Sequence, residues 1–166
     1  MESPSLSRPR NFRPAHGCVW AEWSEKPGFI KEKKRKGKRA DGLRYERKAH
    51  KYLDGLFGEK YVASPWIRFI ANGKSLYCQP DGLVVEKGLC TIVEIKLKHT
   101  AFAWFQIKEL YLPVLKVLMP DTEFNYLEVC RWFDSDTGFP GTFRHAEAIT
   151  QLTSPSEFFV HIWNGR

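Results

Sequence analysis

The sequence predicts an α/β fold in which a central mixed β-sheet is flanked by helices. Three observations support this class: a helical apolar pattern follows residue 41, strand patterns occupy residues 61–98, and a second helical stretch precedes a strand at residues 123–133. The order helix, three strands, helix, strand is typical of a sheet between helical layers. With 43% apolar and 27% charged residues, the 166-residue chain has the composition of a single globular domain.

The first helix is predicted to begin at Asp41, a residue type that favours the N-cap, and to end near residues 55–58. Apolar side chains recur at three- and four-residue steps through Tyr45, Ala49 and Leu53. Glu46 falls inside this apolar arc. We therefore expect its carboxylate to point inward.

The strands that follow are expected to form one antiparallel meander. Asn72-Gly73 predicts a tight hairpin after residues 61–71, because both central turn positions need positive φ. The second strand is expected to run from residue 74 to residue 86. Lys87-Gly88 then turns the chain into a third strand, residues 89–98, in which apolar and charged residues alternate.

The second half of the chain alternates helix and strand. Residues 101–112 are predicted to form a helix that Pro113 or Pro120 kinks or stops, and residues 123–133 to form a strand. The C-terminal segment fits either helix or strand. The aromatic residues Trp66, Phe102, Trp104 and Phe105 are interpreted as packing residues rather than as stacking platforms for bases.

The positive charge is concentrated near the N-terminus. Residues 1–60 contain 16 Lys and Arg against 8 Asp and Glu, whereas residues 61–166 contain 10 against 11. Residues 1–40 are expected to form a basic, partly irregular arm before a domain at residues 41–166. The densest run of positive charge, residues 31–39, is interpreted as a solvated tail, a localisation signal, or a nonspecific contact to a phosphate backbone. The candidate contacts are Lys31, Lys33, Lys34, Arg35, Lys36, Lys38 and Arg39.

The four cysteines include no C-x-x-C pair, which indicates free thiols in a reducing compartment. No apolar run resembles a signal peptide or a membrane span. We expect a cytoplasmic protein, in the host cytoplasm if the chain is viral, with no membrane partner.

The strongest chemical signal comes from Asp81, Glu94 and Lys96. If Lys87-Gly88 is a two-residue loop, Asp81 lies opposite Glu94, whereas a three-residue loop puts it on the other face. Two carboxylates ~4 Å apart repel by about 4 kcal/mol at an effective dielectric of 20, so the pair needs a proton or a cation. Mg²⁺ or Mn²⁺ fits these two ligands together with the backbone carbonyl of Ile95. Lys96 would then orient water or stabilise a phosphorus transition state, although Glu-x-Lys on a strand is commonly an exposed ion pair.

Pro80-Asp81-Gly82 and Glu94-Ile95-Lys96, preceded by a helix with Gly42-x-x-x-Glu46, resemble the PD-(D/E)XK nuclease superfamily over about residues 42–130. The resemblance implies a restriction-endonuclease-like core of order α-β-β-β-α-β. It also implies metal-dependent hydrolysis of nucleic-acid phosphodiesters, with Asp81 and Glu94 as ligands, Lys96 catalytic and Glu46 near the metal.

Three residues beyond this motif are further candidates. Gln106 is similar to the glutamine of the RecB-like and phage exonuclease branches, where a tyrosine follows four residues later; here the tyrosine is Tyr111. Gln106 is therefore either a catalytic residue or an ordinary residue of the helix surface. Lys98 and His99 directly follow the motif and are expected either to contact the scissile strand or to be exposed at the strand end.

The function expected from these features is that of a Mg²⁺-dependent deoxyribonuclease, monomeric or homodimeric, acting in DNA recombination, repair or degradation. The small size suits a phage or mobile-element enzyme. One alternative is a Holliday-junction resolvase, which must be a symmetric dimer. Another is a non-catalytic nucleic-acid- or protein-binding module on a nuclease-like core.

Overall fold

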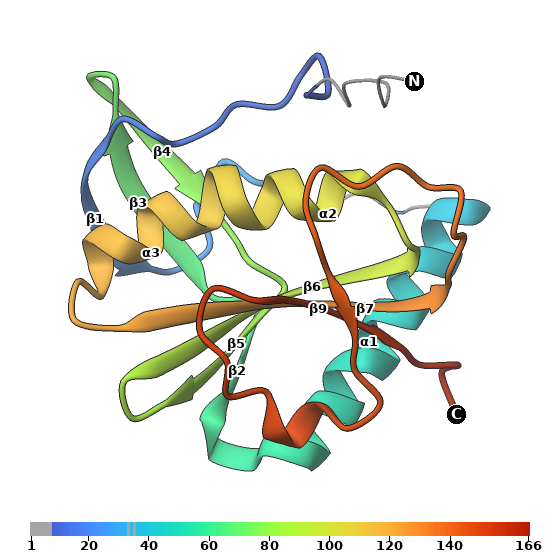
Figure 1. Ribbon diagram of the computed structural model, residues 1–166. Helices are drawn as coiled ribbons and strands as arrows, with labels where there is room; N and C mark the ends of the chain where they lie inside the picture. The colour runs from blue at the N-terminus through green and yellow to red at the C-terminus, as the bar shows by residue number, and fades with distance from the viewer. Residues whose placement is uncertain (1–7, 33, 35) are drawn as a thin grey trace, which may run out of the picture.

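The computed structural model describes residues 8–32, 34 and 36–166, which form two β-sheets and the helices packed on them (Figure 1). A mixed six-stranded sheet has the order β2-β5-β6-β7-β9-β8, and a three-stranded sheet has the order β1-β3-β4. The larger sheet consists of β2 (Tyr61–Ala63), β5 (Gly82–Glu86), β6 (Leu89–Lys98), β7 (Glu123–Trp132), β8 (Arg144–His145) and β9 (Phe158–Ile162). The smaller sheet consists of β1 (Cys18–Ser24), β3 (Trp66–Ala71) and β4 (Lys74–Cys78). The predicted α/β class with a mixed sheet between helices is confirmed.

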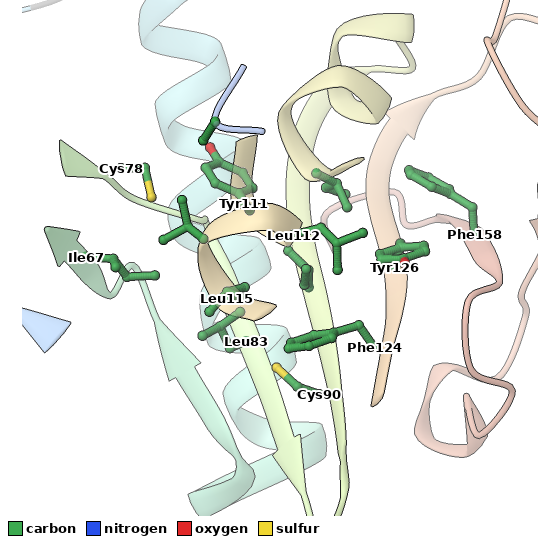
Figure 2. Packing of buried hydrophobic residues seen from close by; sticks show 14 of the residues in the cluster. Ile67, Cys78, Leu83, Cys90, Tyr111, Leu112, Leu115, Phe124, Tyr126 and Phe158 are labelled. Atoms are coloured by element: carbon green, nitrogen blue, oxygen red, sulfur yellow. The ribbon is translucent and has the colours of Figure 1, made fainter. Parts of the chain in front are cut away.

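Two apolar clusters cover the two faces of the larger sheet. Helix α1 (Lys38–Phe57) packs on one face, where Ala49 and Leu53 are fully buried with Val93 of β6. The helical segment α2 (Ala101–Phe105), η2 (Gln106–Tyr111) and α3 (Leu112–Leu118) crosses the other face. Figure 2 shows the second cluster, in which residues of this segment lie over Leu83 and Phe124. The two short 3₁₀ turns are η1 (Gly58–Lys60) and η3 (Ile149–Gln151).

Helix α1 begins three residues earlier than predicted. Gly37, with φ 64°, occupies the N-cap, so Asp41 lies in the first turn instead of capping the helix. An acidic residue is favourable there because the helix N-terminus carries partial positive charge. The predicted boundary between arm and domain at residue 40 therefore falls inside α1, which carries Lys38 and Arg39.

Part of the predicted arm belongs to the fold. Within the arm, which is expected to be partly irregular, residues 18–24 form the regular strand β1, which pairs antiparallel with β3 so that Ala21 lies opposite Phe69. Apolar contact with the core accounts for this, since Cys18 and Ala21 of β1 pack against the cluster that contains Phe69 and residues of α3.

The single predicted meander is also wrong. The hairpin between β3 and β4 is confirmed, with positive φ at Asn72 (51°) and Gly73 (71°). However, β4 and β5 belong to different sheets, and residues 79–81 connect them. Pro80 has no N–H to continue a ladder, so the strand breaks here. At Gly82 the chain passes the ring of Tyr61 so closely that a Cβ would lie 2.5 Å from it.

Of the two prolines expected to kink or stop the second helix, Pro113 does not end it, whereas Pro120 follows its last residue, Leu118, by two positions. The segment runs on to Leu118 through the π-helical turn η2, where the Leu112 N–H donates to the carbonyl of Ile107. Pro113 directly follows this π-turn, and the carbonyl of Glu109, to which a proline four residues later cannot donate, accepts from the N–H of Ala15 at 2.8 Å. The C-terminal segment forms strands, and β9 pairs parallel with both β7 and β8.

All four cysteines are free, and Cys78, Cys90 and Cys130 are buried. Among the described residues, no helix combines the length and the apolar character needed to cross a bilayer.

Candidate active site

The β5–β6 hairpin fixes the position of Asp81 relative to Glu94. Gly82 pairs with Val93 and Glu86 with Leu89, so Lys87-Gly88 is the two-residue loop of the first alternative. Asp81, immediately before β5, accepts a hydrogen bond at Oδ2 from the backbone N–H of Ile95 at 2.7 Å. The hairpin thus brings Asp81 to the Glu94-Ile95 segment.

Burial determines the electrostatics of Asp81. Loss of solvent raises the pKa of Asp81 well above its ordinary value, and the neighbouring charge of Glu94 raises it further. The N–H of Ile95 opposes this shift, while Glu46 adds to it. The carboxyl therefore favours a proton or a nearby cation.

Glu94 is almost completely buried, with 1% of its surface exposed. Its Oε1 lies 2.7 Å from Nζ of Lys96, whereas its Oε2 is buried without a hydrogen-bond partner among the described residues. Burial raises the pKa of Glu94, and Lys96 opposes that shift. The exposed cross-strand ion pair considered above does not describe this site, because the carboxylate lies in the interior with one free acceptor.

A chain of polar contacts extends from Lys96 into the helical segment. Nζ of Lys96 donates to Oε1 of Gln106 at 2.6 Å, and Nε2 of Gln106 donates to the hydroxyl of Tyr111 at 3.3 Å. The Lys96 ammonium also lies 5.3 Å from the ring centroid of Phe102. Gln106 thus contacts the ammonium group of Lys96 instead of lying on an exposed helix surface.

Glu46 faces the same region from α1. It is half-buried, its Oε1 lies 3.7 Å from Nε2 of His50, and it lines a cleft together with Asp81 and Glu94. Its carboxylate faces the cleft and is not enclosed in the core, since 35% of the side chain is exposed. His50 is in turn held by the Tyr61 hydroxyl, 2.7 Å from its Nδ1.

This cleft, of about 1430 Å³, joins the carboxylates to much of the basic segment. The candidate phosphate contacts that line it are Lys31, Lys34, Lys36, Lys38 and Arg39. Lys33 and Arg35 lie outside the described residues. The cleft therefore combines an acidic centre with a cationic wall.

Sequence reasoning missed several residues of the cleft. Lys26, Arg47, Ser64, Trp66 and Gln79 also line it. Trp66 was interpreted as a packing residue, yet β3 buries its neighbour Ile67 instead and leaves Trp66 on the other side of the strand.

His99 is not available for contact with nucleic acid, contrary to one of the two alternatives, nor is it an exposed strand end. It is 2% exposed, and its Nδ1 lies 2.7 Å from Oε2 of Glu128. Its backbone N–H donates to the carbonyl of Trp132, which extends the sheet and draws the imidazole inward. Lys98 is exposed, and its Nζ lies 3.4 Å from Oδ2 of Asp134.

The residues present fit a hard divalent cation in their chemistry. Within the described part of the chain, no group of three or more His, Cys, Asp or Glu side chains is arranged to hold a metal. Asp81, Glu94 and the carbonyl of Ile95 nevertheless form an oxygen-only donor set, which suits Mg²⁺ or Mn²⁺. The buried Oε2 of Glu94 accepts no hydrogen bond from the described residues, so it offers the acceptor that such an ion requires.

Comparisons with protein-family models, with curated proteins and with solved structures gave no match to this chain.

Proposed function

We propose that this chain is a Mg²⁺- or Mn²⁺-dependent deoxyribonuclease with a restriction-endonuclease-like core of the PD-(D/E)XK type. One observation carries the proposal: Asp81 and the buried Glu94, one oxygen of which has no hydrogen-bond partner in the described part of the chain, line a cleft whose wall is rich in Lys and Arg. Buried carboxylates without a cation are costly, and a polyanion is the ligand that a cationic wall favours.

Asp81, Glu94 and the Ile95 carbonyl would hold the metal, with Glu46 close to it in the same cleft. When bound, such an ion lowers the pKa of water and neutralises charge on a phosphodiester. The Ile95 N–H orients Asp81 through the 2.7 Å hydrogen bond.

Lys96 is proposed to orient the attacking water or to stabilise charge on the phosphorus transition state. Its ammonium is held between Glu94 and Gln106, at 2.7 and 2.6 Å. Two fixed partners reduce the freedom of a flexible side chain, so its charge is positioned before substrate arrives. Gln106 acts through Lys96 and is a positioning residue.

The basic wall is proposed to bind the DNA backbone without regard to sequence. Lys31, Lys34 and Lys36 are exposed and line the cleft. Neutralised phosphates release counterions, which makes such binding strong at low salt and weak at high salt.

The test is a gel of supercoiled, linear duplex, single-stranded and four-way-junction DNA incubated with Mg²⁺, Mn²⁺ or EDTA. Metal-dependent cleavage of any substrate supports the proposal, and cleavage restricted to the four-way junction identifies a resolvase. Binding of DNA without cleavage in either metal contradicts catalysis and favours the non-catalytic binding module.

A further inference from the structure

The three-stranded sheet packs one face on the core, and the side chains of β3 on its other face, called here the open face, are only partly buried. Along β3, Ile67 and Phe69 are buried in the core, so the alternate residues Trp66, Arg68 and Ile70 point to the opposite face. On β1, Trp20 is 40% exposed. Large apolar surfaces that stay exposed on a protein commonly mark a binding site.

The strand register arranges this open face in rows. Trp20 pairs with Ile70, Arg68 pairs with both Glu22 and Tyr77, and Ser24 pairs with Trp66. Successive rows lie two residues apart, about 7 Å along the strands. Trp66, in the last row, also lines the cleft that contains Asp81 and Glu94. The open face therefore leads directly into the candidate active site.

Contacts between neighbouring rows hold flat rings beside a cation. The Arg68 guanidinium lies 5.8 Å from the ring centroid of Trp20, and its Nε donates to Ser75 Oγ at 3.0 Å. Glu22 offsets part of its charge at 3.6 Å. Phe29, 73% exposed, packs edge-on against Tyr77 with 5.7 Å between ring centroids.

We propose that this aromatic platform, defined as Trp20, Phe29, Trp66, Arg68 and Tyr77, binds the unpaired bases of a single-stranded nucleic acid. Base stacking on aromatic rings and on arginine is a sequence-tolerant mode of single-strand binding, and a duplex hides the faces that it uses. Continuity with the cationic cleft favours a nucleic acid over a protein partner. The inference rests on the proposed function, in which the cationic cleft binds the backbone of the same DNA strand. It names the substrate class as DNA with a single-stranded segment.

The test measures the affinity of the full chain, in EDTA, for a labelled single strand and a matched duplex of about 20 nucleotides, longer than a typical single-strand site. Wild type is expected to prefer the single strand. Trp20→Ala is expected to weaken single-strand binding about tenfold and to leave duplex binding within about twofold, whereas Trp20→Phe keeps most of the affinity.

Trp132→Ala is the matched control. Trp132 is 57% exposed on β7, with the Arg131 guanidinium 5.0 Å from its ring centroid, so it reproduces the Trp20–Arg68 pair on the other sheet. We expect no change in single-strand affinity. An unchanged affinity of Trp20→Ala, or an equal loss in Trp132→Ala, overturns the platform and leaves the face to a protein partner.

A second measurement uses the unaltered chain, so it does not depend on the folding of a variant. Photocrosslinking with a single strand containing 5-bromodeoxyuridine is expected to label the peptides that carry Trp20, Phe29 or Tyr77. Crosslinks confined to residues outside the platform overturn the inference.

The two proposals fail separately. Cleavage of DNA without a Trp20 effect overturns the platform alone, and single-strand binding through Trp20 without cleavage in Mg²⁺ or Mn²⁺ overturns the proposed catalysis alone. A chain that binds neither oligonucleotide overturns both.

Discussion

Gln106 and Tyr111 lie five residues apart, yet the amide Nε2 of Gln106 donates to the Tyr111 hydroxyl at 3.3 Å. An α-helix brings residues i and i+4 to one face, whereas the π-helical turn Gln106–Tyr111 has a wider repeat and brings i and i+5 together. The other end of the same amide accepts from Lys96. In the nuclease branches that Gln106 resembles, the tyrosine follows the glutamine by four residues. The π-turn therefore compensates for the one additional residue between Gln106 and Tyr111.

Replacing Gln106 tests whether it positions Lys96. Gln106→Leu removes a hydrogen bond to a charged group, so kcat is expected to fall by about tenfold or more. KM and Mn²⁺ affinity should stay close to wild type, because Gln106 contacts Lys96 rather than DNA or metal. Steady-state kinetics with a labelled substrate measure the split, and an unchanged kcat would return Gln106 to the role of an ordinary helix residue.

Lys96→Gln separates catalysis from metal binding. The proposed interaction of Lys96 develops in the transition state, so we expect kcat to fall about 100- to 1000-fold. Mn²⁺ affinity, measured by calorimetry, should change much less than kcat. A loss of Mn²⁺ affinity that accounts for the whole loss of rate would contradict the assigned role.

The raised pKa of Asp81 predicts how stability depends on pH in EDTA. The pKa lies above its ordinary value of 3.8, so the folded chain keeps a proton that the unfolded chain releases. The contribution of Asp81 to the free energy of unfolding is therefore largest below about pH 3.8, and it decreases as the pH rises through the folded-state pKa.

Asp81→Asn removes this titration and should flatten that part of the stability profile, while its stability in EDTA equals or exceeds that of wild type. Denaturant unfolding across the acidic to neutral range measures both. A variant that unfolds far more easily in EDTA would show that Asp81 mainly holds the structure together through Ile95.

Much of the site was accessible from sequence because its determinants are local. The two-residue loop Lys87-Gly88 fixes the register that brings Asp81 to Glu94, and helix periodicity orients Glu46. The separation of β4 from β5 was not accessible, since alternation of apolar residues does not identify which strand will be the partner.

The burial of His99 also depends on residues that are distant in the sequence. Its partner Glu128 lies on the neighbouring strand β7, and its ring contacts Phe133, Phe139 and Phe143 beyond that strand.

The basic wall should control affinity rather than chemistry. Neutralising Lys31, Lys34 and Lys36 to Gln is expected to weaken duplex binding and to reduce the salt slope by about 0.9 for each phosphate that the variant no longer neutralises. The rate at saturating DNA should survive. Deleting residues 1–40 is a poorer test, because it removes β1 from its sheet with β3.

Filter binding of the triple variant at several salt concentrations gives the slope directly. If both affinity and slope match wild type, the segment is a targeting signal or a protein contact, and the catalytic assignment is unaffected.

Catalysis by the carboxylate pair is tested most directly by the initial rate of DNA cleavage in Mg²⁺ and in EDTA for wild type, Glu94→Gln and Glu86→Gln. Glu86 is a matched control, since it lies at the other end of the same hairpin in an exposed ion pair with Lys60. We expect cleavage by wild type and Glu86→Gln in Mg²⁺ and none in EDTA. Glu94→Gln should lose at least about 100-fold in rate. Cleavage by Glu94→Gln at the wild-type rate, or cleavage that persists in EDTA, would contradict a metal-dependent site at Asp81 and Glu94.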